Sequence, residues 1–390
     1  MPKNKFIRSI FKNVESIPKK DWEQVRGGRN IYLSISYLSS LEIAMKDKID
    51  FFYEISYNSD KKPVLISVFQ LVKFVDKRKV YSAQLCKLSY HLSKKLTEAL
   101  TINVLVCGSV FADGENGFLW NDLISPDEAM EEIDSVTKYL KTEEKIKDKA
   151  SVTLFKDFWP TSSPVTDQLK AFSYRDFMVD VNMVLAIHES WVSFDDYLAS
   201  MKTKFRTRAK SVYKKSNNLI LKELSTSEII DNKERLQELF DNVLEKSDFS
   251  FGNLDVSSFI EFSTNLNEEF TITGAYLNKE LVGFSTSFLN GDSLEANYVG
   301  LDYSFNTEHN VYQRLLYNYV EQAITVKVKD LQLGRTSELI KSSIGALPTN
   351  MKLYIKHKSS VSNLLLKPII QSISPSEFEL RQPFKANFSH

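Results

Sequence analysis

The chain has 390 residues, more than a single hydrophobic core usually supports, so its length predicts two domains. Hydrophobic residues make up 43% of it and charged residues 26%, a composition typical of a folded soluble protein. Its 50 basic residues balance 50 acidic ones, and the sequence has neither a zinc-finger spacing nor a heptad zipper, which argues against DNA binding. The two cysteines, Cys86 and Cys107, cannot build a disulfide framework or a zinc site by themselves, so no metal is expected.

The beginning of the chain is basic but lacks the apolar segment of a secretory signal, and no stretch approaches the roughly 18 apolar residues of a membrane span. Five apolar residues near the start have the spacing of a short amphipathic helix: Phe6, Ile7, Ile10, Phe11 and Val14. We expect this segment to dock as the first element of the fold, while contact with an anionic bilayer is the alternative. The expected location is the cytoplasm, with peripheral contact at the inner membrane left open.

The first half of the chain predicts a mixture of strands and helices. Strands are expected where β-branched and aromatic residues gather between polar turns, over 50–58, 63–74, 101–111, 151–159 and 176–187. Helices are expected around 84–98, from Ser125 onward and over 163–174. Ser125 is a strong helix start because Pro126 follows at the first helical position and Glu128 lies three residues after the cap.

The second half predicts the same order of elements. Two hairpins are expected over 270–301, the second closed by Asn290-Gly291, a strong signal for a tight turn. They are followed by an expected helix over 310–324, strand over 330–334, helix over 337–346 and last strand over 351–358. This repeated order predicts two similarly built α/β domains with a mixed sheet in each. We place their boundary near residue 190, which gives domains 1–190 and 191–390.

Residues 202–215 hold seven Lys or Arg and no acidic residue, in a chain whose net charge is zero. The segment belongs to a helix predicted over 193–217, which begins with a capping box made by Ser193 and Asp196. One interpretation is a solvated helix face, and the other is a contact with a phosphate-bearing donor or acceptor. We expect three of these cations to line or flank a cleft between the domains: Arg206, Arg208 and Lys210.

Three motifs in the second half carry a family resemblance. A basic helix, FRTRAKSVYKKSN, precedes the strand LILKEL; the hairpin GAYLNKELVGFSTSF has a polar turn; and in LQLGRTSELIKSSIGA a strand ends at Gly334, seven residues before Lys341. In this order they resemble the Fem-like branch of the GNAT acyltransferases, which includes the CelD/BcsL-like proteins of polysaccharide loci. Gln332 stands where members often have Asp. Fem-like enzymes carry two GNAT-like domains in tandem, and IPKKDWEQV, with Trp22 soon after a proline, is similar to their usual beginning.

The resemblance implies that an amine attacks an activated carbonyl group at the opening between two splayed strands. The matching strands here are SLEANYVGL and DLQLG, and alternation places Glu295 and Asn297 on one face of the first strand and Tyr298 on the other. A carboxylate on this strand is the general base in several relatives, so the resemblance makes Glu295 the leading candidate, with an exposed strand carboxylate as the alternative. The catalytic candidates are therefore Glu295, Asn297 and Tyr298.

The phosphates of a donor would meet the helix N-terminus in the next segment, YSFNTEHNVYQRLL. Most acetyl-CoA enzymes of the fold have a glycine-rich loop there; this segment has no glycine, as in Fem-like members, some of which use aminoacyl-tRNA. The candidates for binding the donor or acceptor are His309, Tyr312, Gln313, Arg335, Lys341 and Trp159, together with Arg206, Arg208 and Lys210 of the basic helix. Two have competing interpretations, His309 as a capping or exposed residue and Trp159 as a core aromatic.

The resemblance implies an acyltransferase that moves an acyl group from a thioester or aminoacyl donor to an amine on a cell-envelope or polysaccharide-type acceptor. The expected co-substrate is acyl-CoA or an acyl carrier protein, with aminoacyl-tRNA as a further possibility. The alternative is a catalytically degenerate GNAT-like module that binds an envelope precursor or a partner protein. The sequence leaves the identities of donor and acceptor and the oligomeric state open.

Overall fold

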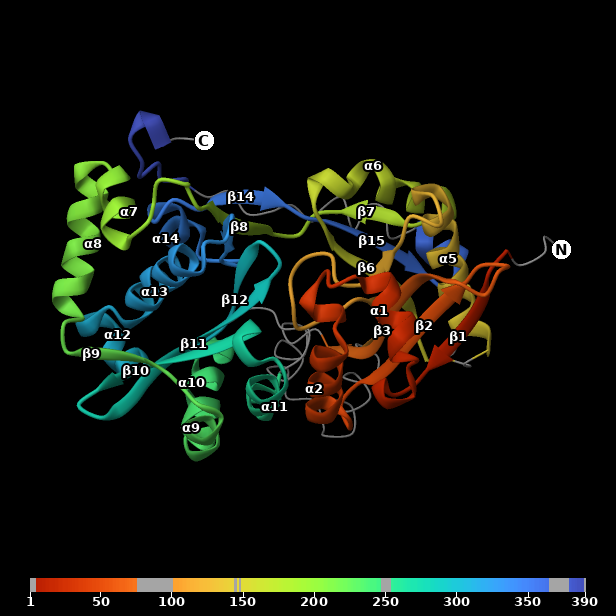
Figure 1. The fold of residues 1–390 in the computed structure, drawn as a ribbon, viewed down its shortest axis with the longest axis horizontal. Helices are drawn as coiled ribbons and strands as arrows, with labels where there is room; N and C mark the ends of the chain where they lie inside the picture. The colour runs from red at the N-terminus through yellow and green to blue at the C-terminus, as the bar shows by residue number, and fades with distance from the viewer. Residues whose placement is uncertain are drawn as a thin grey trace, which may run out of the picture.

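The computed structural model describes residues 5–75, 101–143, 146, 149–246, 254–364 and 379–388. Two halves lie side by side, and each is built on a β-sheet with helices packed against it (Figure 1). Both sheets contain parallel and antiparallel strand pairs, so the prediction of an α/β fold with mixed sheets is confirmed. The helix predicted around 84–98, which would contain Cys86, lies outside the described residues.

The first sheet has the strand order β1-β2-β3-β4-β6-β15-β7, and β5 also pairs with β3. Its one parallel pair among the described strands joins β4 to β6. The bounds are β1 Ile7–Phe11, β2 Asp50–Tyr57, β3 Pro63–Val75, β4 Thr101–Cys107, β5 Phe118–Trp120, β6 Val152–Phe158, β7 Arg175–Phe177 and β15 Lys352–His357. The predicted hairpin over 50–58 and 63–74 is present as β2 and β3.

The second sheet has the strand order β14-β8-β13-β12-β11-β10-β9. Its parallel pair in the described part of the chain joins β12 to β13. The bounds are β8 Val181–Ala186, β9 Leu219–Glu223, β10 Phe270–Leu277, β11 Glu280–Asn290, β12 Ser293–Leu301, β13 Asp330–Gln332 and β14 Leu347–Asn350. The predicted turn at Asn290-Gly291 closes the β11–β12 hairpin, and Gly291 adopts the left-handed backbone with φ 60°.

The helices surround the two sheets. Their bounds are α1 Lys19–Arg26, α2 Ile35–Met45, α5 Pro126–Glu143, α6 Ser163–Thr166, α7 Phe194–Ser200, α8 Thr203–Lys215, α9 Thr226–Asp231, α10 Lys233–Glu245, α11 Ser257–Asn265, α12 Tyr303–His309, α13 Val311–Val326 and α14 Glu338–Ser343. The predicted capping box at the start of α5 is confirmed, because the Glu128 N–H donates to Ser125 Oγ at 3.3 Å and the Ser125 N–H donates to Glu128 Oε2 at 2.8 Å.

The first segment of the chain forms a strand and not the predicted helix. Residues of β1 pair with β2, from Ile7 opposite Tyr57 to Phe11 opposite Tyr53. The prediction of a helix was wrong because five apolar residues in nine positions fit either element, and the free edge of β2 decided between them. The expectation that this segment docks as the first element of the fold is confirmed.

The basic segment is also interrupted, since the helix predicted over 193–217 consists of α7 and α8. Ser193 caps α7 as predicted, accepting from the Asp196 N–H at 3.3 Å. The break falls at Met201, which has an extended backbone and forms an isolated β-bridge with Phe384 near the end of the chain. The local sequence pattern favours one continuous helix, and the β-bridge to the distant Phe384 interrupts it.

Each half contributes a strand to the sheet of the other. The segment 176–187, predicted as one strand, forms β7 in the first sheet and β8 in the second. In return β15, which lies near the end of the chain, inserts between β6 and β7 of the first sheet. A boundary near residue 190 remains a prediction about folding units, and the exchange means that no single cut there separates the two sheets.

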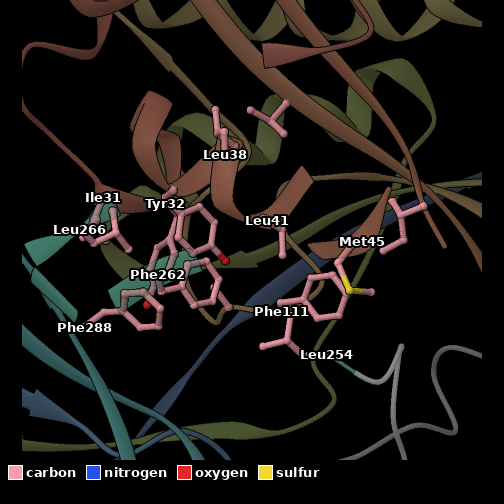
Figure 2. Packing of buried hydrophobic residues seen from close by; sticks show 14 of the residues in the cluster. Ile31, Tyr32, Leu38, Leu41, Met45, Phe111, Leu254, Phe262, Leu266 and Phe288 are labelled. Atoms are coloured by element: carbon pink, nitrogen blue, oxygen red, sulfur yellow. The ribbon is translucent and has the colours of Figure 1, made fainter. Parts of the chain in front are cut away.

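The two halves also share a hydrophobic core. One continuous cluster of buried side chains includes Trp22, Tyr32 and Tyr37 of the first half and Phe262 and Phe288 of the second. The Tyr37 and Phe262 rings stack with centroids 5.2 Å apart. The ring centroids of Tyr32 and Phe288 lie 5.5 Å apart, and Figure 2 shows these two side chains in the cluster. The contact between the halves is therefore packed like a domain interior.

Because of the exchange, residues 1–190 and 191–390 expressed separately are each expected not to fold. The first segment would lack β15 and the second would lack β8, and both are interior strands of their sheets. Circular dichroism and thermal unfolding of each segment would check this, with the co-expressed pair as the control that should recover a cooperative transition. A cooperative transition from either segment alone would contradict the expectation.

Two buried carboxylates meet in the first half, where β1 and β2 face α5. Arg8 donates to Glu132 from Nε at 2.7 Å and from Nη2 at 2.6 Å. Ser56 Oγ lies 2.5 Å from Glu54 Oε1 and 2.6 Å from Glu132 Oε1, and Ser67 Oγ donates to the other Glu54 oxygen at 2.8 Å. One serine proton cannot serve both carboxylates, so a proton on Glu54 completes the network. Burial accordingly raises the pKa of Glu54 to about 8.

Glu54→Gln is expected to change how the free energy of unfolding depends on pH. The pKa of Glu54 is about 8 in the folded protein against an ordinary 4.5, so the folded state holds the extra proton. Stability should therefore fall by up to about 1.4 kcal/mol per pH unit as pH rises between these values. Glutamine keeps the hydrogen bonds without titrating, so the variant should match the wild type near pH 5 and exceed it at pH 9.

Urea unfolding at pH 5, 7 and 9 would measure this difference. Glu131→Gln, on the exposed face of α5, is the matched control and should follow the wild type at every pH. If the free energies of unfolding of Glu54→Gln and the wild type changed with pH in the same way, Glu54 would not carry the extra proton of the folded state.

Candidate active site

The parallel strands of the second sheet separate after a short paired segment. The last paired residues are Glu295 and Gln332; β13 ends there, while β12 continues to Leu301. Within the separating part, Asn297 and Tyr298 together lie opposite Thr286 of β11, which makes a β-bulge. The predicted opening near 298 and 332 is confirmed, and bulges are common beside active sites.

The first sheet opens toward the same place. Its parallel strands β4 and β6 are last paired at Cys107 and Phe155, and the chain beyond each of them, at 110–113 and at Lys156 and Asp157, lines a cleft of about 650 Å³. The separating strands of the second sheet line the same cleft. The two strand openings therefore face each other across the boundary between the halves.

Glu295 is buried at the point where β12 and β13 part, with a relative exposure of 6%. Tyr32 donates its hydroxyl hydrogen to Glu295 Oε2 at 2.5 Å, and Asn290 Nδ2 donates to Oε1 at 2.7 Å. Burial raises the pKa of Glu295 to about 7, although both of these hydrogen bonds lower it. A carboxylate that titrates near neutral pH beside a cleft has the acidity that a general base needs.

The other two catalytic candidates also line the cleft. Asn297 donates from Nδ2 to the Tyr32 hydroxyl oxygen at 3.2 Å. Tyr298 donates its hydroxyl hydrogen to the carbonyl oxygen of Phe111, so it connects the two strand openings directly. Burial raises the pKa of Tyr298 well above its ordinary value, which keeps the hydroxyl protonated.

Arg335 follows β13 and binds carboxylates of the first half. Its Nε donates to Asp113 at 3.1 Å, Nη2 donates to Asp157, and Nη1 lies 4.0 Å from Asp180. Asp157 is fully buried and has a left-handed backbone with φ 63°. Burial alone would raise its pKa, but Lys156 and Arg335 outweigh burial and hold it below the ordinary value. This cluster ties the end of β13 to the end of β6.

Lys341 lies on α14 and reaches back to the same loop. It is 4% exposed, and its Nζ donates to the carbonyl oxygens of Gly334 at 3.2 Å and Arg335 at 2.5 Å. Burial lowers the pKa of Lys341 to about 8. Both Arg335 and Lys341 line the cleft, as does Tyr312, so the structure brings three of the predicted binding residues together with Glu295.

The helix N-terminus that would meet a donor's phosphates is capped by the protein itself. Asn306 Oδ1 accepts from the Tyr312 N–H at 2.9 Å, and Asn310 adopts the left-handed backbone between α12 and α13. In acetyl-CoA enzymes with a glycine-rich loop, backbone N–H groups at this helix N-terminus bind phosphate. Here the N–H of Tyr312 is already bound by the Asn306 side chain.

The basic helix lies away from this cleft. Figure 1 shows α8 on the outer side of the second half, remote from the first sheet. Arg206, Arg208 and Lys210 are absent from the described residues that line the cleft, and the prediction that they line or flank it and contact a donor or acceptor remains a prediction. Arg208 does line a small neighbouring cavity that shares Leu316 and Ile340 with the cleft. The prediction was based on where the helix lies in the sequence, which does not determine where the helix lies relative to the cleft.

The remaining three candidates lie near the cleft but outside its described lining. Trp159 is half-buried; its ring packs on Gly114, and its backbone N–H donates to Glu115 Oε1 at 2.7 Å. His309 ends α12 beside the Phe305 ring. Gln313 lines the small cavity together with Arg208. A binding role for each of these residues remains a prediction.

Sequence reasoning missed several residues of the site because they come from the first half. Tyr32, Asp113, Lys156, Asp157 and Asp180 all contact or surround predicted residues across more than a hundred positions of sequence. The sequence offered a weak signal for one of them, since Asp157 stands at the strand end that matches Gly334 in the repeated order of elements.

The described residues hold no group of three or more His, Cys, Asp or Glu side chains that could bind a metal ion. In the same part of the chain, every helix is too short or too polar to cross a bilayer.

No family model matches the chain, and no curated protein matches it. Among solved structures, the crystal structure of FemX matches 93% of this chain and 100% of its own, with a TM-score of 0.56 and 12% identity. A tandem GNAT protein from the clavulanic acid biosynthesis pathway matches 91% of this chain and 99% of its own, with a TM-score of 0.52 and 8% identity. At such identities the likeness concerns the arrangement of the backbone. The chain thus has the Fem-like tandem GNAT fold.

Proposed function

We propose that this protein is an N-acyltransferase or aminoacyltransferase that acts on an amine of a cell-envelope or polysaccharide-type acceptor, with Glu295 as the general base. The observation that carries the proposal is the position of Glu295, a buried carboxylate with a pKa of about 7 where β12 and β13 part beside the cleft. The tandem GNAT fold supports the class of reaction, and the likeness to FemX supports the class of acceptor.

The proposed reaction uses this geometry directly. The nitrogen lone pair of the acceptor attacks the donor's carbonyl carbon, a C–N bond forms, and the C–S bond of a thioester or the C–O bond of an aminoacyl ester breaks. Glu295 takes the proton that the nitrogen loses, and the departing thiolate or alkoxide takes a proton from protonated Glu295 or from solvent, so that a thiol or an alcohol leaves. Arg335 and Lys341 are the proposed contacts for polar groups of the substrates within the cleft.

Charge in the cleft bears on where a phosphorylated donor binds. Asp113, Asp157, Asp180 and Glu295 face Lys156, Arg335 and Lys341, so the lining has no excess of positive charge. Among the described residues no carboxylate lies within ion-pair distance of the cations at 202–215, and this segment itself contains no acidic residue. We propose that the acyl group enters the cleft while phosphates of the donor contact the outer surface, where Arg206, Arg208 and Lys210 lie.

A donor screen tests the function. Acyl-CoA, acyl carrier protein and aminoacyl-tRNA would each be incubated with amine-bearing glycan precursors, and transfer would be detected by mass spectrometry, with Glu295→Gln as the blank. Product from one donor class is the expected result, and aminoacyl-tRNA would show a steep loss of affinity with salt. Absence of product with every donor, together with a thermal shift on adding a glycan precursor, would overturn the proposal in favour of a binding module. The capped N-terminus of α13 is the observation that keeps this second function in view.

A further inference from the structure

Tyr32 lies behind Glu295 and comes from the opposite half of the protein. It belongs to a short 3-10 helix, Ile31–Leu33, and is 2% exposed. Its ring centroid lies 5.0 Å from that of Tyr37 and 5.5 Å from that of Phe288, so it is held in the core shared by the two halves. Figure 2 shows Tyr32 and Phe288 in this core. The ring therefore has little freedom, and its hydroxyl group has a fixed position.

The hydroxyl group of Tyr32 connects two residues that line the cleft. Asn297 Nδ2 donates to its oxygen at 3.2 Å, so the single hydroxyl hydrogen is directed to Glu295 Oε2 at 2.5 Å. Asn290 donates to the other carboxylate oxygen. Glu295 thus receives two hydrogen bonds that hold it as an acceptor.

The same contact orients the Asn297 amide. Because Nδ2 is bound to Tyr32, Oδ1 points to the other side of the amide, and this buried oxygen has no hydrogen-bond partner among the described residues. A buried carbonyl oxygen without a partner costs free energy unless a ligand supplies an N–H or O–H group. Asn297 and Glu295 both line the cleft, so two acceptor groups lie beside the place where an amine would bind.

We propose that Tyr32 is a positioning residue, which through one hydroxyl group holds Glu295 as the proton acceptor and turns Asn297 Oδ1 toward a second N–H of the attacking amine. This inference rests on the proposed function. A primary amine has two N–H groups, one that passes its proton to Glu295 and one that donates to Asn297. A secondary amine has a single N–H and leaves Oδ1 without a partner. The site is therefore built for a primary amine.

Tyr32→Phe tests the positioning role, since it keeps the ring in the core and removes the hydroxyl group. Tyr37→Phe is the matched control: it lies in the same cluster, and its hydroxyl contacts Ser109 at 3.4 Å, away from Glu295. Carboxyl carbon NMR of the full chain without substrate, assigned with Glu295→Gln, would follow the titration of Glu295. The hydrogen bond from Tyr32 lowers the pKa of Glu295, so its midpoint should move from about 7 to higher pH in Tyr32→Phe and stay in place in Tyr37→Phe.

Turnover gives the second readout. The acid limb of the kcat/KM profile should move with the NMR midpoint, and kcat at pH 7 should fall about tenfold, which corresponds to about one hydrogen bond. Asn297→Ala is the second variant, compared with glucosamine and N-methylglucosamine as amine probes. The wild type should prefer the primary amine about tenfold, and Asn297→Ala should lose that preference.

The outcomes separate the inference from the function on which it rests. A Glu295 midpoint that does not move in Tyr32→Phe overturns the positioning role, and so does an unchanged amine preference in Asn297→Ala. If the midpoint moves but the donor screen yields no product, the proposed function fails while the hold of Tyr32 on Glu295 stands. If Tyr32→Phe does not fold, the preference measured with Asn297→Ala decides the proposal.

Discussion

Replacing Glu295 with glutamine is expected to lower kcat/KM by a factor of about 10² to 10⁴, the range for loss of a general base. The single carbonyl oxygen of glutamine can accept from Tyr32 or from Asn290, which donate to different oxygens of Glu295, but the amide cannot take a proton from the attacking amine. Folding should be retained, because the carboxylate is replaced by a group of the same shape. Steady-state kinetics with the donor identified in the screen would measure the effect.

The pH dependence of the wild type provides an independent check. Glu295 acts as a base only when it is deprotonated, and its pKa is about 7, so kcat/KM should rise with pH through 7 and then level off. In Glu295→Gln this limb should disappear. Glu223→Gln, on the exposed strand β9 of the same sheet, is the control and should keep both the rate and the profile of the wild type. An unchanged limb in Glu295→Gln would assign the base to another group.

Replacing Arg335 with methionine is expected to destabilise the protein by about 3 to 5 kcal/mol, the range for leaving a buried charge without its partner. Asp157 is fully buried and loses one of its two cationic neighbours, and Asp113 loses its contact as well. Urea unfolding at pH 7 would measure the loss. Arg235→Met is the matched control, because Arg235 also binds three carboxylates, Glu238, Glu280 and Asp302, whose side chains are 60%, 58% and 22% exposed. It should cost about 1 kcal/mol or less.

A double replacement assigns the cause of that loss. Asp157→Asn removes the buried charge, so adding it to Arg335→Met should recover part of the stability. The pKa of Asp157 lies below its ordinary value, so its contribution is present above an unfolded-state pKa of about 3.9 and is lost as pH falls through the folded value. The stability gap between wild type and Arg335→Met should therefore narrow in acid. A gap that is constant with pH would show that lost packing is responsible and not charge.

The elements of the fold could be predicted where the signal is local. The capping box at Ser125 and the turn at Asn290-Gly291 depend on neighbouring residues, and both were predicted correctly. Glu295 was chosen as a candidate because it lies on a predicted strand and the family resemblance points to that strand. Its burial, which raises its pKa, was beyond the sequence, because it depends on packing against distant parts of the chain such as Tyr32, 263 residues away.

The errors came from interactions between distant parts of the chain. The segment 176–187 is rich in apolar and β-branched residues and was predicted as one strand, yet its two parts pair with different sheets. Its sequence favours a strand but does not specify which strand lies beside it. The break at Met201 depends on Phe384. The sequence also did not determine which surface the basic face of α8 lies on, since such a face is stable in contact with solvent or with an anion.

The position of β15 has a consequence for how the nascent chain folds. Its residues, 352–357, are synthesised about 10 to 40 s after those of β6, at a rate of about 5–20 residues per second. Until they leave the ribosome, β6 of the first sheet presents an unpaired edge, which is a template for pairing with another chain. A second copy translated nearby can supply its own β15 to that edge, so two polypeptides with exchanged C-terminal strands are the misassembled species that chaperones would have to prevent.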